Sequence, residues 1–284
     1  MPDESAVDTV FVLVHGAWHS SAQWAATQRA LAARGAASTA VDLPGHGFDA
    51  PLPTGYLLPG QPGLAEEESA LAGLTLDDCA ASLVTALREV RRWPRVVLVA
   101  HSAGGGPASL AAELAPDLVD RLVYLSAFVP AGRPRFADYV AAPENADALG
   151  AGLHVGDPAR LGAARINPAS PDPEYVELLR RTHYGDVPAA EFDRWRLALS
   201  PDLPTAIPRT PVALTEQRWG GIPRSFVRLG ADRALTPAAQ DLMVAEADAA
   251  MPRNPFTAHH LPGSHTPFAT RPRELAATLL STLD

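Results

Sequence analysis

The stretch VVLVAHSAGGGP, residues 96–107, carries an apolar run, a turn of small residues and the start of a helical pattern, with Ser102 at the turn. A sharp strand-to-helix turn strains the backbone of its central residue, so the neighbouring residues must be small. Gly104 meets this need, although Ala100 stands where a glycine usually precedes the serine. The pattern predicts that the Ser102 hydroxyl is exposed as a nucleophile at the edge of a sheet. A serine in a glycine-rich turn, binding an anion at most, is the alternative interpretation.

Six apolar runs alternate with helical patterns along the rest of the chain. Continuous apolar runs of this length are typical of strands that are buried on both faces of a parallel sheet. Strands that alternate with helices imply right-handed crossovers, so we expect an α/β fold with a mainly parallel sheet and helices on both faces. The predicted strands are TVFVLVH (9–15), AASTAVDL (36–43), PRVVLVAH (94–101), RLVYLSAFV (121–129), RSFVRLG (224–230) and PFTAHHL (255–261), and the predicted helices cover 21–35, 75–92, 107–117, 236–250 and 271–283.

Two stretches interrupt this alternation. Residues 48–74 are rich in proline and glycine and predict a long irregular excursion. Residues 130–221 contain many prolines and short helical patterns, and they separate two predicted strands of the sheet. An insertion of this size predicts a helical lid. The sequence therefore divides into a core, residues 1–129 and 222–284, and a lid insertion, residues 130–221.

Composition excludes several classes of function. The net charge of −9 disfavours a nucleic-acid partner, because phosphate binding needs clustered cations. All 23 basic residues are arginine, so Schiff-base chemistry and a Ser-Lys dyad have no lysine to use. No apolar run is long enough to cross a bilayer. The acidic start MPDESAVDT lacks the layout of a signal peptide, and Cys79 is the single cysteine. We expect a cytoplasmic protein, monomer or homodimer, that does not bind membranes.

A serine nucleophile needs a base, and the base needs an orienting carboxylate. His265 stands in LPGSHTPF, a loop between the last predicted strand and the last helix. Asp232 stands in LGADRAL, directly after the preceding strand. Asp232 alone would be an ordinary turn residue, but the order Ser102, Asp232, His265, each after a predicted strand, favours a catalytic triad. Asp42 precedes the serine and is the weaker candidate.

The chain has nine histidines, so the other eight need their own interpretation. Position along the chain separates them into loop, strand, lid and elbow residues. We expect His15 and His46 to structure their loops, and His259 and His260 to pack within a strand. His154 and His183 should lie on the lid surface or contact substrate, and His101 should point away from the serine. His19 follows Trp18 and is expected with it in a pocket wall.

The sequence HGAW follows the first predicted strand. In an α/β sheet with a serine elbow, the loop after this strand supplies one N–H group of the oxyanion hole, and the residue after the serine supplies the other. We assign these donors to Ala17 and Ala103. Removing one such donor costs about 2.7–4 kcal/mol of transition-state stabilisation.

The motifs HGAW, DLPGHG, AHSAGG, YLSAFVP and GSHTPF together resemble the plant methyl-esterase and hydroxynitrile-lyase branch of the α/β-hydrolases and its bacterial esterase relatives. The resemblance spans nearly the whole chain and is weakest in 48–74 and in the middle of the lid. It implies a lidded, cofactor-free hydrolase of small esters with the α/β-hydrolase fold. The lyases of this branch carry Thr and Lys where this chain has Gly16 and Thr266, so the resemblance favours an esterase. Ser102 also excludes the relatives that use an aspartate nucleophile.

These observations predict a serine hydrolase that cleaves a small carboxylic ester, or a lactone or thioester, through an acyl-enzyme on Ser102. No metal ligands show a recognisable spacing, so we expect neither metal nor cofactor. An acyltransferase or cyclase using the same triad, and a ligand-binding protein with little turnover, remain alternatives. The pocket is expected to be apolar, and each aromatic candidate for its wall could equally pack in the protein core: Trp18, Phe128, Phe136, Tyr139, Tyr184, Trp195 and Trp219.

Overall fold

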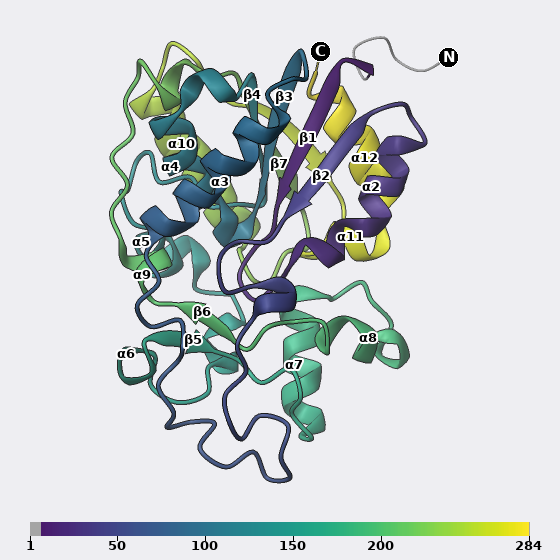
Figure 1. Ribbon diagram of the computed structural model, residues 1–284, viewed down its shortest axis with the longest axis vertical. Helices are drawn as coiled ribbons and strands as arrows, with labels where there is room; N and C mark the ends of the chain where they lie inside the picture. Colours follow the sequence, from purple (N-terminus) through teal and green to yellow (C-terminus); the bar gives the residue numbers. More distant parts are fainter. Residues whose placement is uncertain (1–6, 284) are drawn as a thin grey trace.

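The computed structural model describes residues 7–283, and residues 1–6, which belong to the stretch used above to argue against a signal peptide, lie outside the described part. Its main element is a six-stranded sheet in the order β2-β1-β3-β4-β7-β8, with every neighbouring pair parallel (Figure 1). The six predicted strands are therefore confirmed. Their bounds are β1 Thr9–Val14, β2 Ala37–Val41, β3 Arg95–His101, β4 Arg121–Leu125, β7 Arg224–Leu229 and β8 Thr257–Leu261.

Alternate residues of the central strands face two separate cores. In β1, Phe11 and Leu13 join the core beneath α2 and α12, whereas Val10, Val12 and Val14 join the core beneath α3, α4 and α10. Helices thus cover both faces of the sheet, as expected for parallel strands buried on both sides. The helices of this layer are α2 Ala25–Ala32, α3 Leu76–Val90, α4 Gly105–Leu114, α10 Pro237–Ala250, α11 Pro267–Thr270 and α12 Pro272–Ser281.

The register aligns the carboxyl ends of β3 and β4. His101, the last residue of β3, lies opposite Leu125, the last residue of β4. Ser102 and Ser126 follow these two residues directly, so the chain leaves both strands at the same edge of the sheet. This edge is where ligands bind in open α/β sheets.

The elements between β4 and β7 gather at the end of the molecule toward which the strands point, in the lower half of Figure 1. They are mostly short, as the many prolines predict. A two-stranded antiparallel ribbon, β5 with β6, lies among them and is absent from the sequence prediction. The elements are α5 Phe136–Val140, α6 Pro158–Leu161, β5 Ala163–Arg165, α7 Pro173–His183, α8 Asp193–Arg196, β6 Asp202–Pro204 and α9 Ala206–Arg209.

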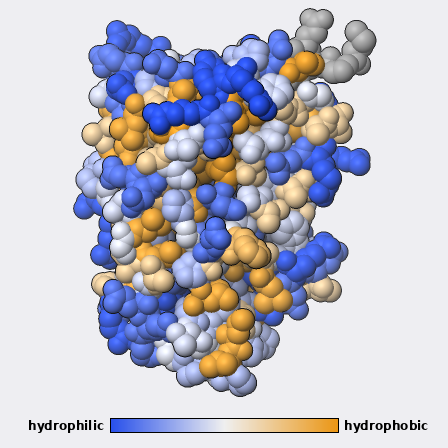
Figure 2. All heavy atoms as spheres, in the orientation of Figure 1, coloured by the Kyte–Doolittle hydropathy of each residue, from blue (hydrophilic) through white to orange (hydrophobic). Residues whose placement is uncertain are grey.

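The excursion 48–74 contains turns rather than helices or strands beyond Asp49 and runs along the same end of the molecule (Figure 1). Several of its apolar side chains are exposed, Leu57 and Leu58 among them. Figure 2 shows apolar atoms gathered at this end, in keeping with those side chains.

A buried ion pair lies within the β5–β6 ribbon, and its arginine also binds the excursion. Arg165 donates from Nε and Nη2 to the two carboxylate oxygens of Asp202, at 2.6 and 2.7 Å. Its Nη1 donates to the carbonyls of Leu64 and Glu67, at 2.8 and 2.9 Å. A buried charge is tolerated only with such complete pairing. Arg165 therefore links the two stretches that interrupt the sequence pattern. None of the helices within residues 7–283 is long and apolar enough to span a membrane.

Candidate active site

The turn after β3 holds Ser102 in a left-handed backbone conformation, with φ of +52°. Residues other than glycine rarely adopt this backbone conformation, and strain of this kind is typical of functional turns. The following glycines are required by space: a Cβ on Gly104 would lie 2.4 Å from the His15 carbonyl oxygen, and one on Gly105 would lie 2.1 Å from that of Phe128. The methyl group of Ala100 is buried within β3, so the fold accommodates it in place of the usual glycine.

The predicted base and acid meet at the same edge of the sheet. His265 Nδ1 lies 2.6 Å from Asp232 Oδ2, and both side chains are buried. The other carboxylate oxygen, Oδ1, accepts the amides of Ala234 and Leu235 at 2.8 and 2.9 Å. Ser126 Oγ donates to Oδ2 at 2.6 Å. The carboxylate is therefore held by four donors that fix its plane.

Ser126 is a site residue that the sequence analysis missed. It has φ of +40° and follows the last residue of β4, as Ser102 follows β3. A polar residue that interrupts the apolar run VYLSAFV at the predicted edge of the sheet is the signal that could have identified it.

The loop that carries His265 lies beside the elbow. The imidazole rings of His101 and His265 are 4.6 Å apart between centroids, and His101 Nε2 lies 2.9 Å from the His265 carbonyl oxygen, to which it can donate. On the opposite side, Thr266 Oγ1 donates to the carbonyl of His183, the last residue of α7, at 2.8 Å. The loop is thus held between β3 and the inserted elements.

The loop after β1 lies directly against the elbow. A Cβ on Gly16 would approach the Cβ of Ser102 to 2.7 Å and Nδ1 of His101 to 2.9 Å, so only glycine fits without a shift. Ala17 and Ser102 line the same cavity, and Ala103 is buried beside the serine. Trp18 has φ of +62°, and its indole Nε1 donates to the Ala164 carbonyl at 2.9 Å.

Other polar residues that could compete for catalytic roles have structural partners. His15 Nδ1 lies 2.8 Å from the Gly16 carbonyl oxygen, and its Nε2 accepts the amide of Leu43 at 3.0 Å. Burial lowers the pKa of His15 well below its usual value, so it stays neutral and structures its loop. Asp42 accepts hydrogen bonds from the amide and hydroxyl of Ser21.

The prediction that both strand histidines are packed is wrong for His260. Its side chain is exposed, because β8 is an edge strand with little covering it on that side.

A cavity of about 520 Å³ opens beside Ser102. Three of the predicted wall residues, Trp18, Phe128 and Phe136, line it together with Ser102. The other four lie elsewhere: Tyr139 accepts the Arg133 amide, the Tyr184 hydroxyl pairs with His19 Nε2, Trp195 packs on Tyr184, and Trp219 donates to the Tyr124 hydroxyl.

Polar residues from the inserted elements also line the cavity. His154 and His183, for which substrate contact was one of the expectations, both do so. Burial lowers the pKa of each ring, that of His183 strongly, so both are neutral near pH 7. Arg209, at the end of α9, was missed, because nothing in its local sequence distinguishes it from a surface arginine.

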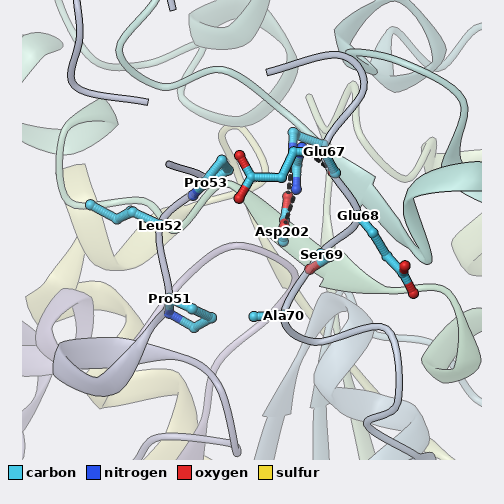
Figure 3. Close-up of a pocket in the computed structure, with 9 residues that line it drawn as sticks. Pro51, Leu52, Pro53, Glu67, Glu68, Ser69, Ala70 and Asp202 are labelled. Atoms are coloured by element: carbon cyan, nitrogen blue, oxygen red, sulfur yellow. Dashed lines mark hydrogen bonds and ion pairs between the residues drawn. The ribbon is translucent and has the colours of Figure 1, made fainter. Parts of the chain in front are cut away.

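A second cavity, of about 280 Å³, lies between the excursion and the β5–β6 ribbon, and Ser102 is not part of its lining. Residues 51–53 and 67–70 border it, with the Arg165–Asp202 pair (Figure 3). Two of its three acidic side chains have partners: Glu67 accepts the amide and hydroxyl of Thr54, and Asp202 accepts Arg165, whereas Glu68 has none among the described residues. Within residues 7–283, no three His, Cys, Asp or Glu side chains are placed to share a metal ion.

Comparison with known proteins agrees with this fold. Methylesterase 7 of Arabidopsis thaliana is 27% identical over 284 residues, which cover 96% of each chain. Among solved structures, the pyrethroid hydrolase PytH superposes with a TM-score of 0.75 at 25% identity, covering 97% of this chain and 98% of that one. Polyneuridine aldehyde esterase superposes with a TM-score of 0.72 at 19% identity, covering 97% and 99%, and supports the fold alone.

The expected resemblance to the plant methylesterases is thereby confirmed, and the names of the relatives support a hydrolase of the esterase type. The family model described as alpha/beta hydrolase family matches residues 11–278, nearly the whole described chain. The protein thus belongs to the alpha/beta hydrolase family.

Proposed function

We propose that this protein hydrolyses a small carboxylic ester through an acyl-enzyme formed on Ser102. The observation that carries the proposal is the position of Ser102, at a left-handed corner that lines the 520 Å³ cavity. A serine is an effective nucleophile only when a base takes its proton. His265, in the adjacent loop and paired with Asp232, is the base of this proposal.

The proposed chemistry follows from the hydrogen bonds of His265. An ionised Asp232 only accepts hydrogen bonds, so Nδ1 of His265 carries its proton toward that carboxylate. Nε2 is then free to take the Ser102 proton as the hydroxyl attacks the ester carbonyl. The resulting imidazolium returns the proton to the leaving alkoxide. Water, activated in the same way, resolves the acyl-enzyme, and Asp232 keeps the tautomer fixed throughout.

The amides of Ala17 and Ala103 are the proposed oxyanion donors. Gly16 brings the loop after β1 against Ser102, and Ala103 begins the turn that continues into α4. Backbone donors fixed before the reaction stabilise the developing charge without reorganisation. The close approach at Gly16 also disfavours a threonine there and thus supports an esterase over a hydroxynitrile lyase.

We further propose that residues 130–221 act as a lid over this site. Support comes from the cavity wall, to which these residues contribute Phe136, His154, His183 and Arg209. A lid of this kind limits water and shapes the acyl and alcohol subsites.

The test is hydrolysis of 4-nitrophenyl acetate and butyrate by the wild-type protein and by Ser102→Ala, with labelling by a fluorophosphonate probe. We expect turnover and labelling in the wild type and the loss of both in the variant. Turnover that survives in Ser102→Ala would refute the assignment of the nucleophile. Acyl groups passed to an added alcohol in preference to water would convert the proposal into acyl transfer.

A further inference from the structure

The cavity beside Ser102 has an uneven charge distribution. Most of its lining is apolar or small, from residues such as Phe128, Phe136 and Leu203. Among the described residues that line it, Arg209 alone carries a formal charge near neutral pH, because burial lowers the pKa of both lining histidines. No carboxylate is part of this lining, although the protein as a whole carries a net charge of −9.

Arg209 has its donors available. Its side chain makes no hydrogen bond or ion pair with any residue in the described part of the chain. Two other arginines of the same insertion are engaged: Arg165 is bound by Asp202, and Arg133 by Glu246. Arg209 is exposed to solvent and contributes to the cavity lining, so its guanidinium has no protein partner that a ligand would have to displace.

Two other polar residues of the lining, Thr205 and Asn145, are uncharged and do not neutralise Arg209. Thr205, one turn earlier in the same segment, also lines the cavity, and its hydroxyl donates a hydrogen bond to the Gly162 carbonyl. Asn145 accepts the Thr236 amide and donates to the Val140 carbonyl, so its amide group is engaged as well. A planar guanidinium binds a carboxylate through two parallel hydrogen bonds, which no other group in this wall can offer.

We propose, on the basis of the esterase function above, that the cavity binds an ester carrying a carboxylate on its acyl chain, and that Arg209 binds this carboxylate. The substrate class is the monoester of a dicarboxylic acid with an apolar linker. The linker lies along the apolar wall, the ester meets Ser102, and the free acid meets the guanidinium. Arg209 is then a specificity-determining residue that acts on binding and leaves the chemistry at Ser102 unchanged.

The test uses pairs of substrates that differ only in charge. The 4-nitrophenyl monoesters of adipic, suberic and sebacic acid are compared with the same compounds whose distal acid is capped as a methyl ester. Chains shorter than adipate are omitted, because their carboxylate attacks the ester without an enzyme. The chain length with the highest kcat/KM reports the span from Ser102 to Arg209.

For the wild type we expect kcat/KM to be about 10- to 100-fold higher for the acid than for its capped partner, the range of a charged hydrogen bond. Arg209→Gln removes this preference by raising KM for the acid, so that the ratio of kcat/KM between the acid and its capped partner falls to about one. Added 0.5 M NaCl reduces the wild-type preference, because salt screens the ion pair. Arg88→Gln, an exposed arginine on α3 outside the cavity lining, controls for the change in net charge and keeps the preference.

The failure of this inference differs from the failure of the proposed function. Equal acid-to-capped ratios in the wild type and Arg209→Gln overturn the role of Arg209, while turnover of both esters still supports the esterase. If neither ester is turned over, calorimetry with monomethyl adipate on the Ser102→Ala protein decides. Binding that weakens at least tenfold on adding Arg209→Gln supports the anion subsite, and equal or absent binding overturns it.

Discussion

The amide of Ser264 donates a hydrogen bond of 3.0 Å to Asp186 Oδ2, across 78 positions of sequence. The Asp186 amide lies 3.4 Å from the Ser264 hydroxyl, so the two residues are joined twice. Ser264 directly precedes His265, and Asp186 follows α7 in the inserted segment. The position of the imidazole therefore depends on residues that belong to the insertion, not only on the sheet.

Replacing Asp186 should affect the rate more than binding. Asp186→Ala removes the acceptor that holds the loop before His265, and a misplaced base lowers transition-state stabilisation. We expect kcat for 4-nitrophenyl butyrate to fall about 10-fold with little change in KM, on the scale of one charged hydrogen bond. Asp193→Ala, whose carboxylate pairs with Arg196 at the surface, is the control and should retain kcat. An unchanged kcat in Asp186→Ala would show that the loop holds its position without this contact.

The four donors around Asp232 predict a graded series. Asp232→Asn keeps the shape but presents an amide that can stabilise the wrong tautomer of His265, so kcat should fall about 10⁴-fold. Ser126→Ala removes one of the donors and leaves the carboxylate in place, so a loss of about 10-fold is expected. Steady-state kinetics measures both, with circular dichroism to confirm folding. A larger loss in Ser126→Ala than in Asp232→Asn would contradict the assignment.

Replacing Gly104 or Gly106 by alanine should change the stability of the protein in opposite directions. Gly104→Ala places a methyl group 2.4 Å from a backbone oxygen, so the elbow must shift and stability should fall by about 1–3 kcal/mol. At Gly106, in α4, the nearest atom would be Cδ1 of Leu76 in α3, at 3.7 Å, an ordinary van der Waals contact. Gly106→Ala should stabilise by about 0.5–1 kcal/mol through helix propensity. Urea unfolding checks both. A Gly104→Ala variant as stable as the wild type would mean that the close approach at Gly104 is absent in solution.

Buried histidines should make the protein sensitive to acid. Burial lowers the pKa of His15, His101 and His183 well below 6.5, and that of His19 to about 3. The unfolded chain takes up protons on these groups below pH 6.5, whereas the folded protein does not, so the free energy of unfolding falls as pH falls. Each such group contributes about 1.4 kcal/mol per pH unit once its unfolded form is protonated.

The slope of stability against pH tests this directly. Urea unfolding between pH 8 and 5 should show a plateau at high pH and a steep loss below pH 6.5. His183→Phe should lower the slope by about one proton. The exposed His260, replaced in His260→Gln, should leave the slope unchanged. A flat profile down to pH 5 would show that these rings are protonated in the folded protein.

The Arg165–Asp202 pair should be costly to break. Arg165→Met leaves a buried carboxylate without its partner, and the expected loss of stability is about 3–5 kcal/mol. Arg135→Met removes an arginine from an exposed pair with Asp138 and should cost less than about 1 kcal/mol. Calorimetric unfolding compares the two variants. The double variant Arg165→Met/Asp202→Leu should recover part of the loss, since it leaves no buried charge alone.

The sheet and the elbow could be predicted because their signals are local and periodic. Each strand is a short apolar run, and topology then places Ser102, Asp232 and His265 at the same edge. The order of these three residues along the chain, each after a predicted strand, is enough to predict that they meet there. His265 Nδ1 and Asp232 Oδ2 meet as the prediction requires, whereas their functional roles remain the subject of the experiments above.

The insertion could not be predicted in the same way. The strands of the β5–β6 ribbon are three residues each, too short for periodicity, and Arg165 finds its partner 37 positions later. Aromatic residue type does not separate a cavity wall from a protein core: Phe136 lines the cavity, while Tyr139, one turn along in α5, is fully buried beside Arg133. Such distinctions depend on which elements pack together, and that is set by long-range contacts.

The anchoring of Leu64 and Glu67 by Arg165 has a consequence for recombination between relatives. A chimaera that exchanged residues 130–221 alone would bring a foreign ribbon against the native 48–74 segment. Unless the donor supplied an equivalent guanidinium, two carbonyl oxygens would lose their donor in the interior. Residues 48–74 and 130–221 should therefore be exchanged together. Only such a double exchange should transfer the substrate range of one relative to another.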